Sequence, residues 1–180
     1  MKLLFLDFDG VLNSMQSTRM HWQNQGRKCV FTNEDFMSPE CCSNLRYLMD
    51  ELQDVYIVIS SSWRLMHDLS ELKTILEMLC KIAPNRILGT TPYLANKQRG
   101  EEIQDWLDEN TKVPEGSTLM PKYQIDDFMI IDDDGDMAHL KATNFLQTDH
   151  DLGFTIKDCR KLIERFRGTP IDTSAKGGDW

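Results

Sequence analysis

The stretch KLLFLDFDGVLN, residues 2–13, is the most informative part of the sequence. Four consecutive apolar residues, Leu3 to Leu6, predict a strand that is buried on both faces, which is typical of a central strand in a parallel sheet. Asp7 and Asp9 follow at the end of this strand, one residue apart. On an extended backbone their side chains leave the same face, whereas Phe8 points the other way into the packing.

Two carboxylates this close repel each other, and a bound cation is the usual compensation. Gly10 permits a tight turn or a close approach of the backbone to a ligand. The position of these residues at the end of a strand also fits a ligand site, because open parallel sheets bind ligands beyond the carboxyl ends of their strands. The simpler alternative is that Asp7 and Asp9 end a strand and cap a turn.

Length and composition describe an ordinary globular chain. At 180 residues, with 41% hydrophobic and 27% charged residues, the sequence predicts one domain with a full core. The net charge of −9 provides no general basic surface for nucleic acid and would repel an anionic membrane. A polyanionic substrate would therefore need a local positive patch or a metal ion. We expect no signal peptide, no membrane span, no obligate protein partner and a cytoplasmic location. Five cysteines without metal-binding spacing indicate reduced thiols.

The second predicted strand, residues 55–59, ends in a run of hydroxyl residues. A helix capped by Ser38 should precede this strand, and residues 14–37 before it are polar and irregular, either a flap over the site or a surface excursion. Hydroxyls at the end of a strand can donate to an oxyanion or can cap a helix. We assign the functional role to Ser60 first and to Ser61 second.

Later segments add a cationic and an acidic signal. After a helix at about 65–82 and a short strand at 86–89, Lys97 and Arg99 precede a helix, where a cation is unfavourable unless something negative lies nearby; a solvated basic pair is the alternative. A buried strand at 128–131 then ends in the acidic run 132–136, which lacks the spacing of a calcium loop and better fits metal binding beside the first strand. An edge strand at 144–148, a helix capped by Thr155 and a disordered tail at 169–180 complete the chain.

Taken in chain order, the four signals at residues 7–11, at Ser60, before the helix that follows Arg99 and at residues 131–133 resemble the haloacid dehalogenase (HAD) superfamily of phosphohydrolases. The resemblance covers roughly residues 2–166. Residues 7–11 resemble the superfamily's first motif, the run ending in Ser60 its second, a basic residue before a helix its third, and residues 131–133 its fourth. The finer resemblance is to the small HAD domains of RNA-repair and phage-type proteins. It implies an α/β, three-layer Rossmann-like fold with a mainly parallel central sheet and a minimal cap, formed as a single domain by residues 1–168.

The resemblance also implies roles for individual residues. Asp7 would be the nucleophile that becomes an aspartyl-phosphate, and Asp9 would protonate the leaving alcohol and then activate water. Ser60 would hydrogen-bond the phosphoryl oxygens. Arg99 would be the cation that balances their charge, with Lys97 as the alternate.

Metal ligands follow from the same resemblance. Asp133 would bind Mg²⁺ together with Asp7 and the backbone carbonyl of Asp9, while Asp132 or Asp136 would hold metal-bound water. Independently of the resemblance, further substrate contacts are predicted at Gly10, Ser61, Arg64 and Lys97. A local positive patch would be formed by His21, Arg27, Lys28 and Arg64.

The predicted function is a magnesium-dependent phosphomonoesterase. Small gaps between the motifs indicate an open site, which favours a phosphate on a nucleotide or on the 3′ end of a nucleic acid. Phosphoryl transfer to another acceptor, as in mutases, and a binding module without turnover are the alternatives.

Overall fold

The structure is a computed structural model that describes residues 1–25, 37–112 and 120–168, without the side chains at positions 21, 22, 24 and 25. In this part of the chain, one sheet has the strand order β3-β2-β1-β4-β5, and every pairing is parallel. The predicted parallel sheet, with the first strand at its centre and the last at its edge, is therefore confirmed. The strands are β1 (Lys2–Leu6), β2 (Val55–Ile59), β3 (Ile87–Thr90), β4 (Asp127–Asp132) and β5 (Phe145–Gln147).

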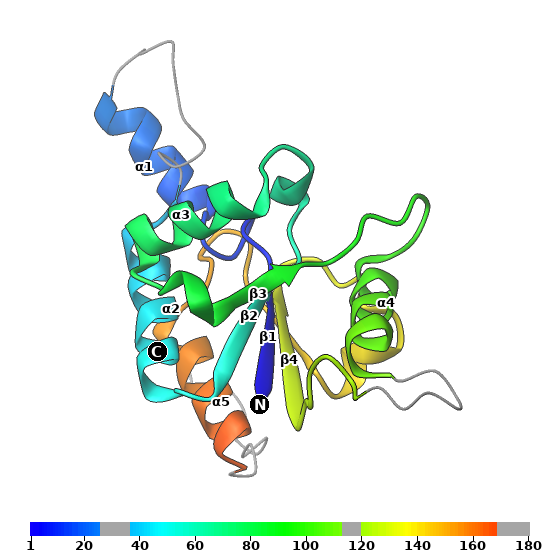
Figure 1. The fold of residues 1–180 in the computed structure, drawn as a ribbon. Helices are drawn as coiled ribbons and strands as arrows, with labels where there is room; N and C mark the ends of the chain where they lie inside the picture. Colours follow the sequence, from blue (N-terminus) through cyan, green and yellow to red (C-terminus); the bar gives the residue numbers. More distant parts are fainter. Residues whose placement is uncertain (26–36, 113–119, 169–180) are drawn as a thin grey trace.

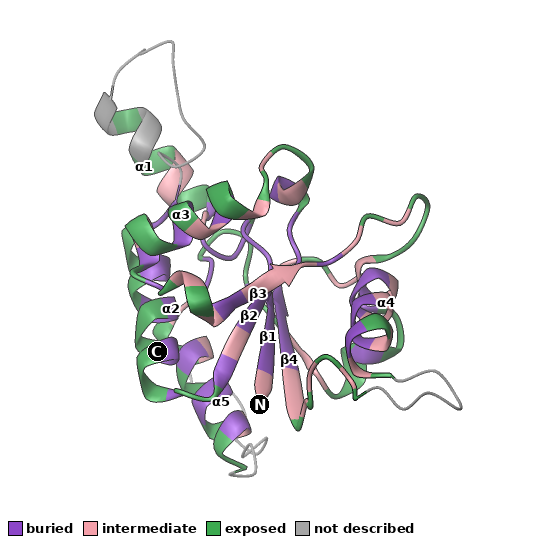
Figure 2. Ribbon diagram, viewed as in Figure 1, coloured by how far each residue is buried: buried purple, intermediate pink, exposed green. Residues whose placement is uncertain are grey.

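Helices cover both faces of the sheet and give three layers (Figure 1). On one face lie α2 (Pro39–Glu51), α3 (Leu69–Cys80) and α5 (Ile156–Arg167), and on the other lies α4 (Arg99–Thr111) with the short 3₁₀ helix η4 (Ala138–Ala142). The side chains of β1 divide between two cores, with Leu4 and Leu6 facing the first layer and Leu3 and Phe5 facing the second. Figure 2 accordingly shows the middle of the sheet as buried. The predicted Rossmann-like α/β fold is confirmed.

Capping side chains set the helix starts. Ser38 accepts a hydrogen bond from the Cys41 N–H at the start of α2, and Thr155 forms a reciprocal capping box with Asp158 at the start of α5, both as predicted. The helix predicted from about residue 65 differs. A 3₁₀ turn, η2 (Ser62–Leu65), comes first, and α3 starts only after Asp68, which forms its own capping box. A second 3₁₀ turn, η3 (Pro84–Arg86), leads into β3.

The expectation of an irregular segment after residue 14 is wrong for residues 15–25. They form α1 (Met15–Gln25), whose first turn is capped by the Ser14 hydroxyl, which accepts from the Ser17 N–H. Met15 and Met20 are 36% and 53% exposed, so an apolar stripe that would have predicted this helix is missing from its described side chains. Figure 1 shows α1 projecting from the end of the molecule where β1 ends. The rest of the predicted flap, 26–36, and the tail, 169–180, lie outside the described residues.

Four cysteines, Cys41, Cys42, Cys80 and Cys159, are buried free thiols, and Cys29 lies outside the described residues. Among the helices that the structure describes, none has the length and apolar character needed to cross a membrane.

Candidate active site

Strand register places three predicted site residues side by side. Leu6 pairs with Ile59 of β2 and with Ile131 of β4, so the next residue of each strand, Asp7, Ser60 and Asp132, reaches the same edge of the sheet. Two backbone bonds continue the ladder there, from the Asp7 N–H to the Ile131 carbonyl at 3.0 Å and from the Ser60 N–H to the Leu6 carbonyl at 2.8 Å. The chain crosses from one side of β1 to the other between β3 and β4, which makes this edge the switch point where such sheets bind ligands.

Three carboxylates gather at this edge. Asp7, Asp132 and Asp133 each offer an oxygen within 4.8 Å of the others. Burial raises the pKa of Asp7 to about 6, although a hydrogen bond from Ser61 and the charge of Arg99 act in the opposite direction. Burial, with the charge of Asp7 second, raises the pKa of Asp132 to about 8. The protein alone therefore compensates this negative charge incompletely, and a cation would complete the compensation.

Gly10 brings the backbone against this cluster. Its φ of 68° is in the left-handed region, and a Cβ at this position would lie 2.2 Å from the carboxyl carbon of Asp133. The Thr148 hydroxyl fixes the turn by donating to the Gly10 carbonyl at 2.9 Å. On the outer side of the cluster, Nδ1 of His150 lies 2.5 Å from an oxygen of Asp133. Neither Thr148 nor His150 was predicted as a site residue.

Buried polar atoms without a hydrogen-bond partner mark the same edge. Within the described residues these atoms are Asp7 Oδ1, Ser60 Oγ, Arg64 Nε and Thr91 Oγ1, all on residues that follow the carboxyl ends of β1, β2 and β3. Unpaired buried groups are costly unless water or a ligand completes them. Ser61 differs from Ser60, because its hydroxyl accepts from the Trp63 N–H and also bonds Asp7. Ser61 therefore has the capping role, whereas the hydroxyl of Ser60 has no partner within the protein.

Asp9 is exposed and is held outside the carboxylate cluster. The indole N–H of Trp63 lies 3.1 Å from both of its oxygens, and the Asn13 amide donates to it at 2.7 Å. The Ser62 hydroxyl adds a longer bond of 3.3 Å. Sequence reasoning missed all three donors, although Ser62 belongs to the serine run that it singled out and Trp63 follows that run directly.

The start of α4 supplies the cation. Nε of Arg99 lies 3.8 Å from Asp132 Oδ2, whereas Lys97 is exposed and pairs with Glu101 at 2.7 Å. The structure thus brings Arg99, and not Lys97, to the carboxylates. Asp136 lies outside the three-carboxylate cluster, and its side chain accepts from the Arg99 N–H at 3.2 Å. Gly100 makes the close approach possible, since a Cβ there would lie 2.2 Å from the Met137 carbonyl oxygen.

A protein-family model, described as the HAD domain in Swiss Army Knife RNA repair proteins, matches residues 3–159. The chain belongs to this HAD family. The match runs from β1 into α5 and includes every predicted site residue, so the resemblance seen in the sequence is confirmed. Membership indicates a phosphatase-type hydrolase that takes a phosphorylated substrate and uses a divalent metal. Searches of curated proteins and of solved structures found no match.

In this HAD domain Arg64 is committed to protein contacts. Its guanidinium lies 2.6 Å from Glu102, with both side chains about 5% exposed, and it donates to the Ser61 carbonyl at 2.5 Å and to the Pro92 carbonyl at 3.3 Å. Burial lowers the pKa of Arg64. Glu102 was not predicted, and it also lies 3.7 Å from Arg99. The other members of the predicted positive patch, His21, Arg27 and Lys28, lie outside the described side chains.

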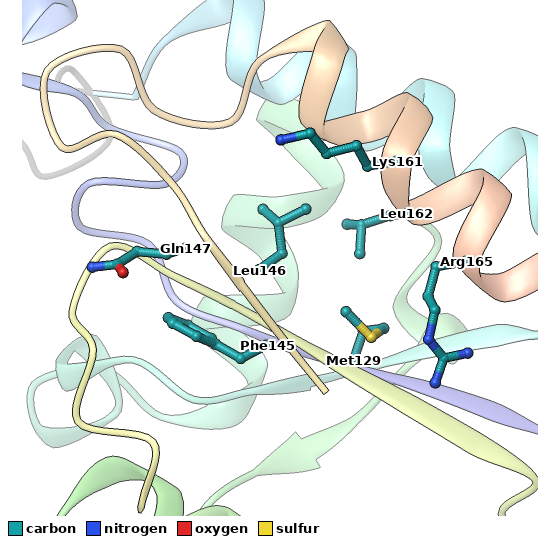
Figure 3. A pocket seen from close by; sticks show the side chains of 7 residues that line it. All are labelled: Met129, Phe145, Leu146, Gln147, Lys161, Leu162 and Arg165. Atoms are coloured by element: carbon teal, nitrogen blue, oxygen red, sulfur yellow. The ribbon is translucent and has the colours of Figure 1, made fainter. Parts of the chain in front are cut away.

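A separate groove of the HAD domain lies between β5 and α5. Figure 3 shows Met129, Leu146 and Leu162 facing it from β4, β5 and α5. Its lining contains none of the predicted site residues. The carboxylates, and not this groove, therefore define the candidate active site.

Proposed function

We propose that the chain is a magnesium-dependent phosphomonoesterase that works through an aspartyl-phosphate on Asp7 and acts on a nucleotide or on the 3′-phosphate end of a nucleic acid. The observation that carries the proposal is the pair of unpartnered buried oxygens, Asp7 Oδ1 and Ser60 Oγ, beside a cluster of three carboxylates. An aspartate nucleophile and a phosphate-binding hydroxyl need such free oxygens. HAD membership supports the reaction class, and the RNA-repair description of the family supports the substrate class.

The residues present fit a magnesium ion. Mg²⁺ prefers oxygen ligands and is usually held by one or two carboxylates with water. Asp7 and Asp133 would hold it with the backbone carbonyl of Asp9, while Asp132 would bind its water. Bound there, the ion supplies the positive charge that lets a carboxylate approach a phosphate dianion. The raised pKa values of Asp7 and Asp132 support the same assignment, because they record negative charge that the protein alone leaves uncompensated.

Each step of the reaction then has a residue. A carboxylate oxygen of Asp7 attacks phosphorus, the ester P–O bond breaks, and Asp9 donates its proton to the departing alcohol. Asp9 next takes a proton from water, which attacks the phosphorus of the acyl phosphate and releases inorganic phosphate and free Asp7. Ser60 donates to the phosphoryl oxygens, and Arg99 balances their charge. Trp63 and Asn13 orient Asp9 through the bonds already described.

The need for several charged groups follows from the reaction. Hydrolysis of phosphate monoesters without an enzyme is so slow that enzymes accelerate it by up to about 10²¹-fold. Electrostatic groups that are fixed before the reaction contribute most to such accelerations. The strands and α4 hold Asp7, Ser60 and Arg99 in place through backbone bonds, so little rearrangement is needed.

The proposal is tested with an aryl phosphate, with Mg²⁺ or with a chelator, in the wild type and in Asp7→Asn. We expect Mg²⁺-dependent release of phosphate by the wild type and a loss of at least about 10³-fold in Asp7→Asn. Asp50→Asn removes an exposed carboxylate at the end of α2 and is the matched control. Equal turnover by wild type and Asp7→Asn would refute the nucleophile, and no turnover on a broad panel of phosphate esters would favour the binding module.

The substrate and the location are also proposals. Release of phosphate from a 3′-phosphorylated oligonucleotide, compared with release from mononucleotides, distinguishes the two substrate classes. The net charge of −9 supports a short substrate or a chain end over a long nucleic acid. A cytoplasmic location, where such substrates and reduced thiols coexist, is checked by fractionation.

A further inference from the structure

A small groove opens directly beside the proposed phosphate site. Its lining includes Arg99, Arg64 and Ser62 from the active site together with Tyr93, Leu65 and Lys97. Its volume is about 180 Å³, below the roughly 300–1,000 Å³ of pockets that enclose drug-sized ligands. A site of this size, next to Arg99, suits one small flat group attached to the phosphate.

The groove presents an aromatic ring to solvent. Tyr93 is 63% exposed and Leu65 is 58% exposed, so both side chains are accessible to a ligand in the groove. Aromatic rings that stand free at a nucleic-acid site serve as platforms on which bases stack. The same lining holds the cations Lys97 and Arg99 with the carboxylates Glu102 and Asp136. Lys97 pairs with Glu101, so Arg99, which also approaches Asp132, is the cation that links the groove to the proposed phosphate site.

The backbone on both sides of Tyr93 is anchored. The carbonyl of the preceding residue, Pro92, accepts from Arg64, and the N–H of the following residue, Leu94, donates to Glu102 at 2.9 Å. Arg64 and Glu102 are themselves buried and paired at 2.6 Å. The exposed ring therefore stands on a fixed support, so that stacking a flat group on it loses little conformational entropy.

We propose that this groove binds the nucleoside that carries the phosphate, with the base stacked on Tyr93. The inference rests on the proposed phosphatase function and adds to it the groove and the side chain that would recognise the base of the substrate. The phosphate lies at Ser60 and Arg99, and the sugar bridges the short distance to the groove that Arg99 also lines. The groove takes one base, so a longer chain adds little binding.

The test compares adenosine 3′-monophosphate with ribose 3-phosphate, which lacks the base. In Tyr93→Ala we expect kcat/KM for the nucleotide to fall about 10- to 100-fold more than kcat/KM for the sugar phosphate. This ratio corresponds to the loss of the free energy with which one base stacks on an aromatic ring. Tyr93→Phe keeps the ring and should retain most of the preference. Tyr47→Ala, which removes another exposed tyrosine from α2, is the control and should leave both values unchanged. Equal effects of Tyr93→Ala on the two substrates would overturn the inference and leave the phosphatase function standing.

A binding measurement separates the two proposals. Calorimetry with adenosine 3′-monophosphate and Mg²⁺ on Asp7→Asn, with and without Tyr93→Ala, reports the groove independently of turnover. Binding that weakens about 10-fold or more in the double variant supports the groove, even if the wild type hydrolyses no ester and the phosphatase proposal fails. Binding that is absent, or that is the same with and without the ring, overturns the inference. Thermal melting of each variant checks the fold, which an exposed side chain should not change.

Discussion

Asp7→Asn should stabilise the metal-free protein while abolishing its activity. Asp7 is 5% exposed, and burial raises its pKa from 3.8 to about 6. This change corresponds to about 3 kcal/mol that ionisation of Asp7 costs the folded state, at about 1.4 kcal/mol per pKa unit. The substitution removes the charge and keeps the size of the side chain. It should therefore raise the free energy of unfolding at pH 8 by the same amount.

The sign of the pH dependence follows from linkage. Because the folded-state pKa lies above the unfolded value, the contribution to stability is fully present below pH 3.8 and is lost as the pH rises through about 6. Asp132 extends the loss toward pH 8, since burial and the charge of Asp7 raise its pKa further. The advantage of Asp7→Asn over the wild type should therefore be largest above about pH 6 and vanish below about pH 4.

Thermal unfolding at several pH values, in chelator and in Mg²⁺, measures both effects. For a chain of this length about 3 kcal/mol corresponds to a rise in Tm of about 6–12 °C at pH 8 in chelator. In Mg²⁺ the wild type should gain stability, by about 2.7 kcal/mol at 100 times the Kd, and Asp7→Asn should gain less. An Asp7→Asn protein that melts no higher than the wild type in chelator at pH 8 would refute the uncompensated buried charge. The exposed Asp50→Asn control should melt like the wild type at each pH.

Four further substitutions test other parts of the site. Trp63→Phe removes the indole donor to Asp9 and keeps an aromatic ring against Phe8, so kcat on an aryl phosphate should fall about tenfold without unfolding. Arg99→Ala should lower kcat/KM about 10²-fold or more, whereas Lys97→Ala should lower it less than about threefold because Lys97 pairs at the surface. Gly100→Ala forces a Cβ against the Met137 carbonyl and should cost about 1–3 kcal/mol in urea unfolding.

The parts of the site that the sequence could predict are those tied to strand ends. Buried apolar runs identify strands whatever they pack against, and the parallel register then places Asp7, Ser60 and Asp132 at one edge. Strand register does not place Arg99, because the chain crosses to the other face of the sheet before α4 begins. Only the resemblance to HAD proteins predicted that Arg99 lies near the carboxylates. Strand register alone explains why the predicted and observed positions of these strand-end residues agree. It can be inferred without knowing how the side chains pack.

The parts that sequence reasoning missed depend on contacts between distant segments. Trp63 resembles a core residue, and its N–H on Asp9 follows from the 3₁₀ turn that the serine run starts. Glu102 occupies the first turn of α4, where an acidic residue is expected for helix stability alone. Helix α1 was missed for the opposite reason, since its described side chains pack against little and leave no periodic pattern.

Glu102 connects the proposed phosphate site with the groove. One of its oxygens lies 2.6 Å from Arg64 and 3.7 Å from Arg99, and the other accepts from the Leu94 N–H. A single buried carboxylate thus faces two guanidinium groups, and one positive charge is left over. Arg99 is the more exposed of the two and also approaches Asp132, so this remaining charge is directed toward the carboxylates, where a transferred phosphoryl group would meet it. The same carboxylate fixes the backbone beside Tyr93. In the proposed function, substrate selection and charge stabilisation would therefore share one anchor.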